Sequence, residues 1–181
     1  MINADYTDAY INGGDQGYEL VVHKYNDALL KYCHSILCNY HDAQDALQIV
    51  FIKAYDKRAS FGKSNKISLN AFLYKIAYNT CIDILRKRKF VLFPRYAARE
   101  EGYISEPLRT ALLTLPDIER AVVYSHAVEQ LPFAELAEMY GKTPAALRKR
   151  YERAKKKLAA ALADEYPRIT ENGGVKNEQN I

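Results

Sequence analysis

The sequence predicts an all-α protein made of two small helical domains joined by a flexible linker. Apolar residues recur at the spacing of amphipathic helices from Tyr18 to about Lys89, and again from Leu108 to about Ala163. Between these runs the chain shows no sustained period and contains Pro94, which disfavours the interior of a helix or a strand. We therefore expect a first domain over residues 1–89, a linker over 90–106, a second domain over 107–163 and a polar tail over 164–181.

The first domain begins with two amphipathic helices. One covers the apolar run that ends near Leu37, and the polar residues 39–41 interrupt it. Asp42 is expected to cap the next helix, which stops near Lys57.

A loop and a further helix complete the first domain. Residues 60–68, with the sequence SFGKSNKIS, are rich in loop-forming residue types. Ser68 or Asn70 can then cap a helix that runs into the basic block at residues 86–89. The expected buried stripe of this helix comprises Leu73, Ile76, Ala77, Thr80, Cys81 and Ile84.

The second domain is predicted to be a helix-turn-helix. A short helix over residues 108–113 precedes a longer one that has Pro116 at its first position. Residues 133–140 then form a short helix, Gly141 and Lys142 make a tight turn, and Thr143 caps a long basic helix that opens at Pro144.

Three residues support this prediction in particular. A helix-turn-helix needs a small residue where its helices cross, a residue that tolerates positive φ in the turn, and an apolar anchor in the second helix. Ala137, Gly141 and Leu147 stand at those places.

The charge distribution indicates a polyanionic partner. The net charge is only +4, but residues 86–89 are all basic, and residues 144–158 hold seven basic residues against one acidic residue. Such clusters suit nucleic acid, because each neutralised phosphate releases condensed counterions. On the last helix, Ala145, Arg148 and Lys149 can face a major groove, while Arg153 and Lys156 are better placed for phosphates.

Other classes of function find little support. Three cysteines with no disulfide-like spacing, an N-terminus without a signal peptide and the lack of a long apolar run predict a cytoplasmic protein without membrane insertion. No nucleotide-binding loop, nucleophile elbow or metalloprotease motif is present, so we expect neither catalysis nor a cofactor. Cys33 and Cys38 are five residues apart, which spreads them around a helix, so a zinc site with His34 and His41 is not expected.

The residues 108–158 resemble region 4 of the extracytoplasmic-function class of sigma factors, in the sigma-70 family. The shared features are Leu-Pro at 115–116, Glu-Leu-Ala at 135–137, Gly141 and Arg-x-x-Arg-Ala at 150–154. This resemblance implies that the domain binds the −35 promoter element. The residues then expected to contact DNA are Thr143, Ala145, Arg148, Lys149, Arg153 and Lys156.

The stretch DAQDALQIVFIKAYDK, residues 42–57, resembles a helix of region 2 in the same family. The resemblance implies that this helix docks on the clamp coiled coil of the largest subunit of RNA polymerase. The polar residues at matching positions are Asp42, Asp45, Gln48 and Lys53. Ile49 stands where the family usually has Glu.

The stretch FLYKIAYNTCIDILRKRK, residues 72–89, resembles the next helix of region 2. Asn79, Asp83 and Arg86 fall on one face of this helix, opposite the apolar stripe. The resemblance implies that this face, with Lys87, reads the −10 element, and that the loop over 60–68 captures a base flipped from the non-template strand. A stacking surface and hydrogen-bonding groups for that base are expected from Phe61, Asn65 and Lys66.

The resemblance implies core RNA polymerase, promoter DNA and an anti-sigma factor as partners. The chain would direct promoter-specific initiation by binding alone. A stand-alone helix-turn-helix regulator that binds operators as a dimer, with residues 1–89 as a sensor, is the alternative. The two region 2 motifs argue against that alternative, because a sensor domain has no need of them.

Overall fold

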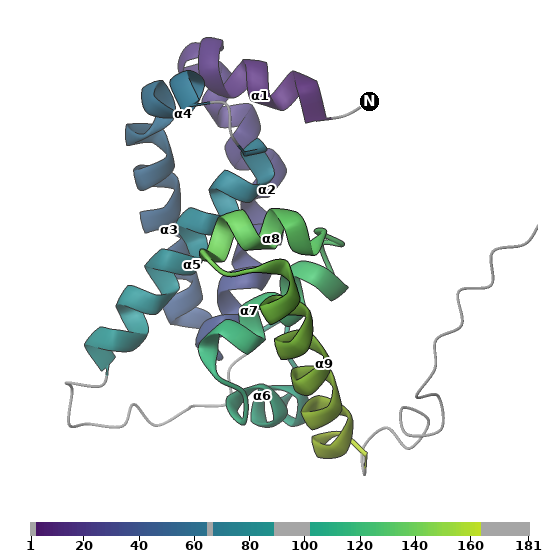
Figure 1. Cartoon of the computed structure of the whole chain (residues 1–181). Helices are drawn as coiled ribbons and strands as arrows, with labels where there is room; N and C mark the ends of the chain where they lie inside the picture. The colour runs from purple at the N-terminus through teal and green to yellow at the C-terminus, as the bar shows by residue number, and fades with distance from the viewer. Residues whose placement is uncertain (1–2, 65–66, 89–101, 164–181) are drawn as a thin grey trace, which may run out of the picture.

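The computed structural model describes residues 3–64, 67–88 and 102–163, and every regular element in these ranges is a helix (Figure 1). The side chains of residues 3–5 and 64 are not described. The helices are α1 (Asn3–Asn12), α2 (Gly14–Leu37), α3 (Tyr40–Asp56), α4 (Arg58–Ser64), α5 (Leu69–Arg88), α6 (Glu106–Leu113), α7 (Asp117–Ala127), α8 (Phe133–Tyr140) and α9 (Pro144–Ala161). The all-α prediction is confirmed.

The first domain is built on α2, α3 and α5, which pack side by side (Figure 1). Five of the six predicted stripe residues of α5 are buried, and Ile84 is half-buried. Cys33 of α2 and Cys81 of α5 are fully buried free thiols, so they serve as small core residues. Ser68 caps α5, since its Oγ accepts a hydrogen bond from the backbone N–H of Ala71 at 3.1 Å.

The cap of α3 differs from the prediction. Asn39, in an extended conformation, accepts a hydrogen bond on its Oδ1 from the backbone N–H of Asp42 at 2.8 Å. Asp42 therefore lies in the first turn of the helix, where its charge still favours the helix dipole. The helix is thus capped three residues earlier than expected, because the side chain of Asn39 accepts from a backbone N–H of the first turn.

Two short helices were not predicted. Residues 58–64, which overlap the expected loop over 60–68, form α4, because Phe61 buries its ring in the core and holds the turn. The helix α1 forms near the N-terminus, where Tyr10 is completely buried. Gly17 permits this packing, since a side chain there would collide with the backbone of Ala9.

The second domain has the predicted helix-turn-helix. Gly141 ends α8 with a φ of +61°, and the Thr143 Oγ1 accepts a hydrogen bond from the backbone N–H of Ala146 at 3.2 Å. Leu147 is fully buried as the anchor of α9. Pro116 precedes α7 as its cap residue instead of starting it, and α9 ends at Ala161, two residues before the expected end.

The two domains pack against each other within one continuous hydrophobic core. In Figure 1, α8 and α7 lie against the face formed by α5 and α2, in agreement with the contacts between α2 and α7 and between α5 and α8. The Tyr32 hydroxyl of α2 lies 2.9 Å from the Tyr140 hydroxyl at the end of α8. Most of the linker, residues 89–101, lies outside the described residues.

The burial of Tyr10 makes α1 an integral part of the first domain. Its hydroxyl donates to the Ala54 carbonyl oxygen at 2.6 Å, and its ring meets the Phe61 ring edge-on at a centroid distance of 5.4 Å. We expect Tyr10→Ala to lower the free energy of unfolding by about 3–5 kcal/mol. Tyr10→Phe, which loses only the hydrogen bond, should cost about 1 kcal/mol. Urea unfolding followed by circular dichroism measures both values, and equal effects would show that the ring does not contribute.

Candidate nucleic-acid and polymerase interfaces

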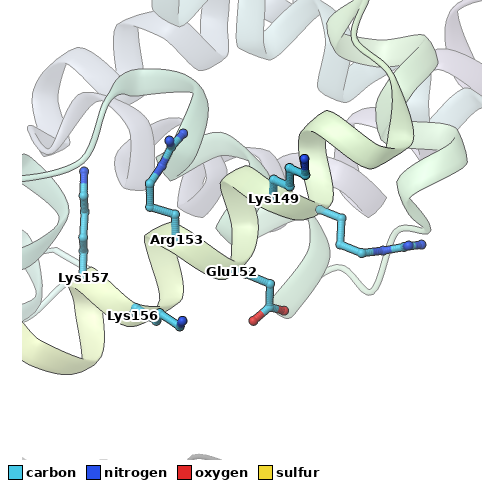
Figure 2. Close-up of a pocket in the computed structure, with 6 residues that line it drawn as sticks. Lys149, Glu152, Arg153, Lys156 and Lys157 are labelled. Carbon is cyan, nitrogen blue, oxygen red and sulfur yellow. The ribbon is translucent and has the colours of Figure 1, made fainter.

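The basic face of α9 is set by its buried side. Leu147 and Ala154 point into the domain, which leaves a row of charged side chains on the outer face. They line a surface hollow of about 550 Å³, and the six lining residues are Arg148, Lys149, Glu152, Arg153, Lys156 and Lys157. Figure 2 shows that Arg153 and Lys157 point to one side of the helix, whereas Glu152 and Lys156 point to the other.

A buried carboxylate on α7 explains why Arg153 and Lys157 point to the same side of α9. Glu119 is only 2% exposed, and its Oε1 accepts from the Arg153 Nε at 3.1 Å and from an Arg153 terminal nitrogen at 2.9 Å. Its Oε2 lies 3.8 Å from the Lys157 Nζ. Arg153 was predicted to contact phosphates, but its guanidinium fastens α9 to α7 while remaining half-exposed.

Glu119 itself was missed by the sequence analysis. A local signal is that Arg153 and Lys157 lie one residue before and three residues after Ala154, a small apolar residue of the kind that faces a core. Cations at such an edge can pair with a carboxylate of the element packed there or extend into solvent. The identity of that partner depends on how α7 packs on α9, which spacing along the chain does not reveal.

The N-terminal half of α9 presents the other predicted DNA-contacting residues. Ala145, Arg148 and Lys149 are exposed, as is Lys156 further along the helix. The Arg148 guanidinium lies 5.5 Å from the centroid of the Phe133 ring on α8, a cation–π distance that orients it across the turn. Thr143 is exposed, but its hydroxyl oxygen serves as the helix cap.

The predicted polar face of α5 is present. Asn79, Asp83, Arg86 and Lys87 are all exposed. An Asp83 carboxylate oxygen lies 4.0 Å from an Arg86 nitrogen and another lies 3.8 Å from the Lys53 Nζ of α3. Lys53 also donates to the Thr80 hydroxyl at 3.2 Å. Lys53 was expected to contact polymerase, but its side chain contacts Asp83 and Thr80 of α5, the helix that was expected to contact DNA.

The outer face of α3 combines polar and apolar side chains. Asp45 and Gln48 are exposed as predicted, and the neighbouring Ile49 and Ile52 are 38% and 63% exposed. Asp42 departs from the prediction, since its side chain is nearly buried and forms an ion pair with Arg88 at the end of α5. Asp42 thus ties α3 and α5 together instead of facing outward.

Of the three residues expected to capture a base, the structure describes the side chain of Phe61 alone. Phe61 is 4% exposed, and its ring packs on Phe72 at a centroid distance of 4.7 Å. In this position the ring has no open face for a base, because the aromatic residues of α1 and α5 cover it. Asn65 and Lys66 lie outside the described residues.

Within the described ranges, no group of three or more His, Cys, Asp and Glu residues is arranged to hold a metal ion. No helix in these same ranges has both the length and the apolar character to span a membrane.

The geometry defines a two-part helical protein with a helix-turn-helix that presents a basic second helix. Comparison with known proteins identifies its family. The family model described as Sigma-70 region 2 matches residues 21–91, and the one described as Sigma-70, region 4 matches residues 105–158. The chain belongs to the sigma-70 family of RNA polymerase sigma factors, in the extracytoplasmic-function class.

Curated relatives are similar over nearly their whole lengths. The chain is 28% identical over 177 residues to the ECF RNA polymerase sigma factor SigW of Bacillus subtilis, with 85% of this chain and 94% of the relative covered. It is 25% identical to the ECF RNA polymerase sigma factor SigM of Mycobacterium tuberculosis, with 88% and 84% covered. The chain accordingly acts with core RNA polymerase to direct promoter-specific transcription initiation.

Two solved structures share the fold. The sigma factor RpoE from Bartonella quintana, in complex with the anti-sigma factor NepR, has a TM-score of 0.68 at 22% identity, covering 80% of this chain and 96% of that one. CnrH, in complex with the cytosolic domain of CnrY, has a TM-score of 0.70 at 23% identity, covering 90% and 98%. These similarities confirm the two-part helical fold.

The Glu119 contacts should stabilise the second domain. We expect Glu119→Gln to lower the free energy of unfolding by about 1–2 kcal/mol, because it removes charge-assisted hydrogen bonds whose partners are half-exposed and therefore screened. Glu152→Gln is the matched control, since Glu152 is exposed and forms an ion pair with Lys155 on the same helix, at 3.7 Å. Chemical denaturation of the full chain measures both, and equal stabilities of the two variants would contradict a positioning role for Glu119.

Proposed function

We propose that three helices divide the work of promoter recognition: α9 binds the −35 element, α5 binds the −10 element and α3 binds core RNA polymerase. The observation that carries this proposal is the exposed basic face of α9, which begins directly after the helix-turn-helix turn. Each of the three faces lies within a match to the corresponding family region.

In the proposed −35 contact, the first turns of α9 enter the major groove. Arg148 and Lys149 donate to guanine edges, and the small side chains of Thr143 and Ala145 allow close approach to the bases. Lys156 neutralises a backbone phosphate. Arg153, half-exposed beside Glu119, adds a phosphate contact from a fixed position.

The proposed −10 contact uses the outer face of α5. Asn79 and Asp83 offer hydrogen-bonding groups to unpaired bases, and Arg86 and Lys87 neutralise the adjacent backbone. Asn65 and Lys66 remain candidates for holding a flipped base. Because Phe61 is buried among aromatic residues of α1 and α5, we assign it a supporting role in place of stacking.

The proposed polymerase contact is the outer face of α3. Asp45 and Gln48 supply polar contacts beside the exposed side chains of Ile49 and Ile52. Isoleucine at position 49 makes this face more apolar than the glutamate usual in the family would. Lys53 and Asp42 hold α3 on α5, so that polymerase binding and −10 recognition share one rigid support.

We also propose an anti-sigma factor as a partner and the cytoplasm as the place of action. The supporting observation is that two solved proteins of this fold were found in complexes. RpoE is bound to the anti-sigma factor NepR, and CnrH is bound to the cytosolic domain of CnrY. The mechanism involves binding only, since the family is a class of transcription factors and the faces described above offer hydrogen bonds and charge.

Transcription by purified core polymerase on fragmented genomic DNA tests the −35 assignment. We expect the chain to create start sites that share a two-part upstream motif. Arg148→Ala combined with Lys149→Ala should reduce initiation there at least tenfold, because each well-placed base contact contributes about 1–3 kcal/mol. The control, Lys24→Ala with Lys31→Ala on α2, removes the same charge elsewhere. Unchanged starts with the α9 variant would refute the assignment.

Polymerase binding tests the α3 assignment. Ile52 is exposed, so Ile52→Glu should leave the free energy of unfolding within about 0.5 kcal/mol of the parent value. The same change should weaken binding to core polymerase about tenfold or more, because a charge would be buried in the contact. Leu20→Glu on α2 is the matched control, since Leu20 is 58% exposed. Competition binding measures both, and the assignment fails if the two variants bind equally well.

A further inference from the structure

The helix α9 contains one acidic residue, Glu152, and this residue lies in the middle of its outermost face. The buried Leu147 and Ala154 define the inner side of the helix. Four exposed residues at the spacing i, i+4, i+7 and i+11 form a stripe on the opposite side: Ala145, Lys149, Glu152 and Lys156. A carboxylate therefore stands between two lysines on the face that we propose meets DNA.

The ion pair of Glu152 leaves its carboxylate accessible. Its Oε2 lies 3.7 Å from the Lys155 Nζ, and the side chains of Glu152 and Lys155 are 53% and 60% exposed. Such a pair contributes little to stability, because water and salt screen it. Figure 2 shows that Glu152 points to the same side of α9 as Lys156 and away from Arg153. The carboxylate can thus exchange Lys155 for another donor without disturbing the domain.

A carboxylate in a major groove discriminates between bases by charge. It is repelled by the N7 and O6 acceptors of guanine and by the O4 acceptor of thymine. Adenine presents an amino group, but its N7 acceptor lies beside that group. Cytosine presents its N4 amino group and no acceptor in the major groove. Of the four bases, cytosine therefore suits the Glu152 side chain best.

The spacing along α9 brings Glu152 near the base pair that Lys149 is proposed to contact. Three residues of an α-helix rise by about 4.5 Å, whereas one base pair of B-DNA rises by about 3.4 Å. Lys149 donates to a guanine edge in the proposed −35 contact. A lysine and a glutamate three residues apart on the outer stripe thus fit a guanine and a cytosine in neighbouring base pairs.

We propose that Glu152 is a specificity-determining residue of the −35 contact, and that its carboxylate accepts a hydrogen bond from the amino group of a cytosine. This proposal rests on the proposed role of α9 in binding the −35 element. The basic residues of α9 attract DNA of any sequence, and Glu152 disfavours the sequences that present an acceptor at its position.

Transcription by core polymerase with the full-length chain, on a mapped promoter randomised within its −35 element, measures the base preference at each position. We expect the parent chain to favour cytosine at one position about fivefold or more. Glu152→Ala should reduce this preference to about twofold or less and leave the other positions unchanged. Glu152→Gln should shift the preference at the same position to adenine, because an amide pairs with the N6 and N7 atoms of adenine.

Two controls separate base reading from a general effect of charge. Glu138→Gln makes the same charge change at an exposed position of α8, and Lys155→Ala removes the ion-pair partner of Glu152. Neither should alter a base preference. If both Glu152 variants instead raise initiation equally on all promoters of the library, the carboxylate acts by repelling phosphates alone, and the proposal is overturned.

The outcomes distinguish this proposal from the one on which it rests. If Arg148→Ala with Lys149→Ala abolishes the promoter-specific starts, but the Glu152 variants keep every base preference of the parent chain, base reading by Glu152 is refuted while the −35 assignment stands. If the starts do not require Arg148 and Lys149, the −35 assignment fails and the proposal fails with it. A cytosine preference that is lost with Glu152→Ala and moved to adenine with Glu152→Gln supports the proposal.

Discussion

The position of Tyr140 determines how the two halves of the molecule are arranged. It is the last residue of α8 and stands directly before Gly141, whose left-handed conformation turns the chain into α9. Its hydroxyl meets Ser125 within its own domain and Tyr32 in the other. Burial raises the pKa of this hydroxyl to about 12, so it remains a neutral donor and acceptor at physiological pH. One buried side chain at the end of α8 therefore contacts both domains, directly before the turn that leads into α9.

Acidic side chains at the helix contacts determine which cations are held in a fixed position. Glu119 holds Arg153 and Lys157, Asp42 holds Arg88, and Asp83 lies between Lys53 and Arg86. In each case a carboxylate joins two helices or two turns of one helix. The paired cations, such as Arg153, are held in position by their carboxylates while staying partly exposed, and the unpaired ones extend freely from the same helices.

Sequence periodicity and turn chemistry predicted the helix-turn-helix correctly, because the cap at Thr143, the turn at Gly141 and the anchor at Leu147 are local features. The faces of α5 were predictable for the same reason. The burial of Phe61 was not, since it depends on Tyr10, some fifty residues earlier in the chain. Asp42 was misjudged similarly, because its partner Arg88 is brought near only when α3 packs on α5.

The proposed division of roles agrees with the faces that the fold leaves accessible. The outer face of α3, which we propose binds polymerase, includes the exposed side chain of Ile52. The face of α9 that we propose meets DNA is exposed because Leu147 and Ala154 turn the opposite side of that helix into the domain. Under these assignments polymerase and the −35 element approach different helices of the chain, so the binding of one partner does not have to cover the face that binds the other.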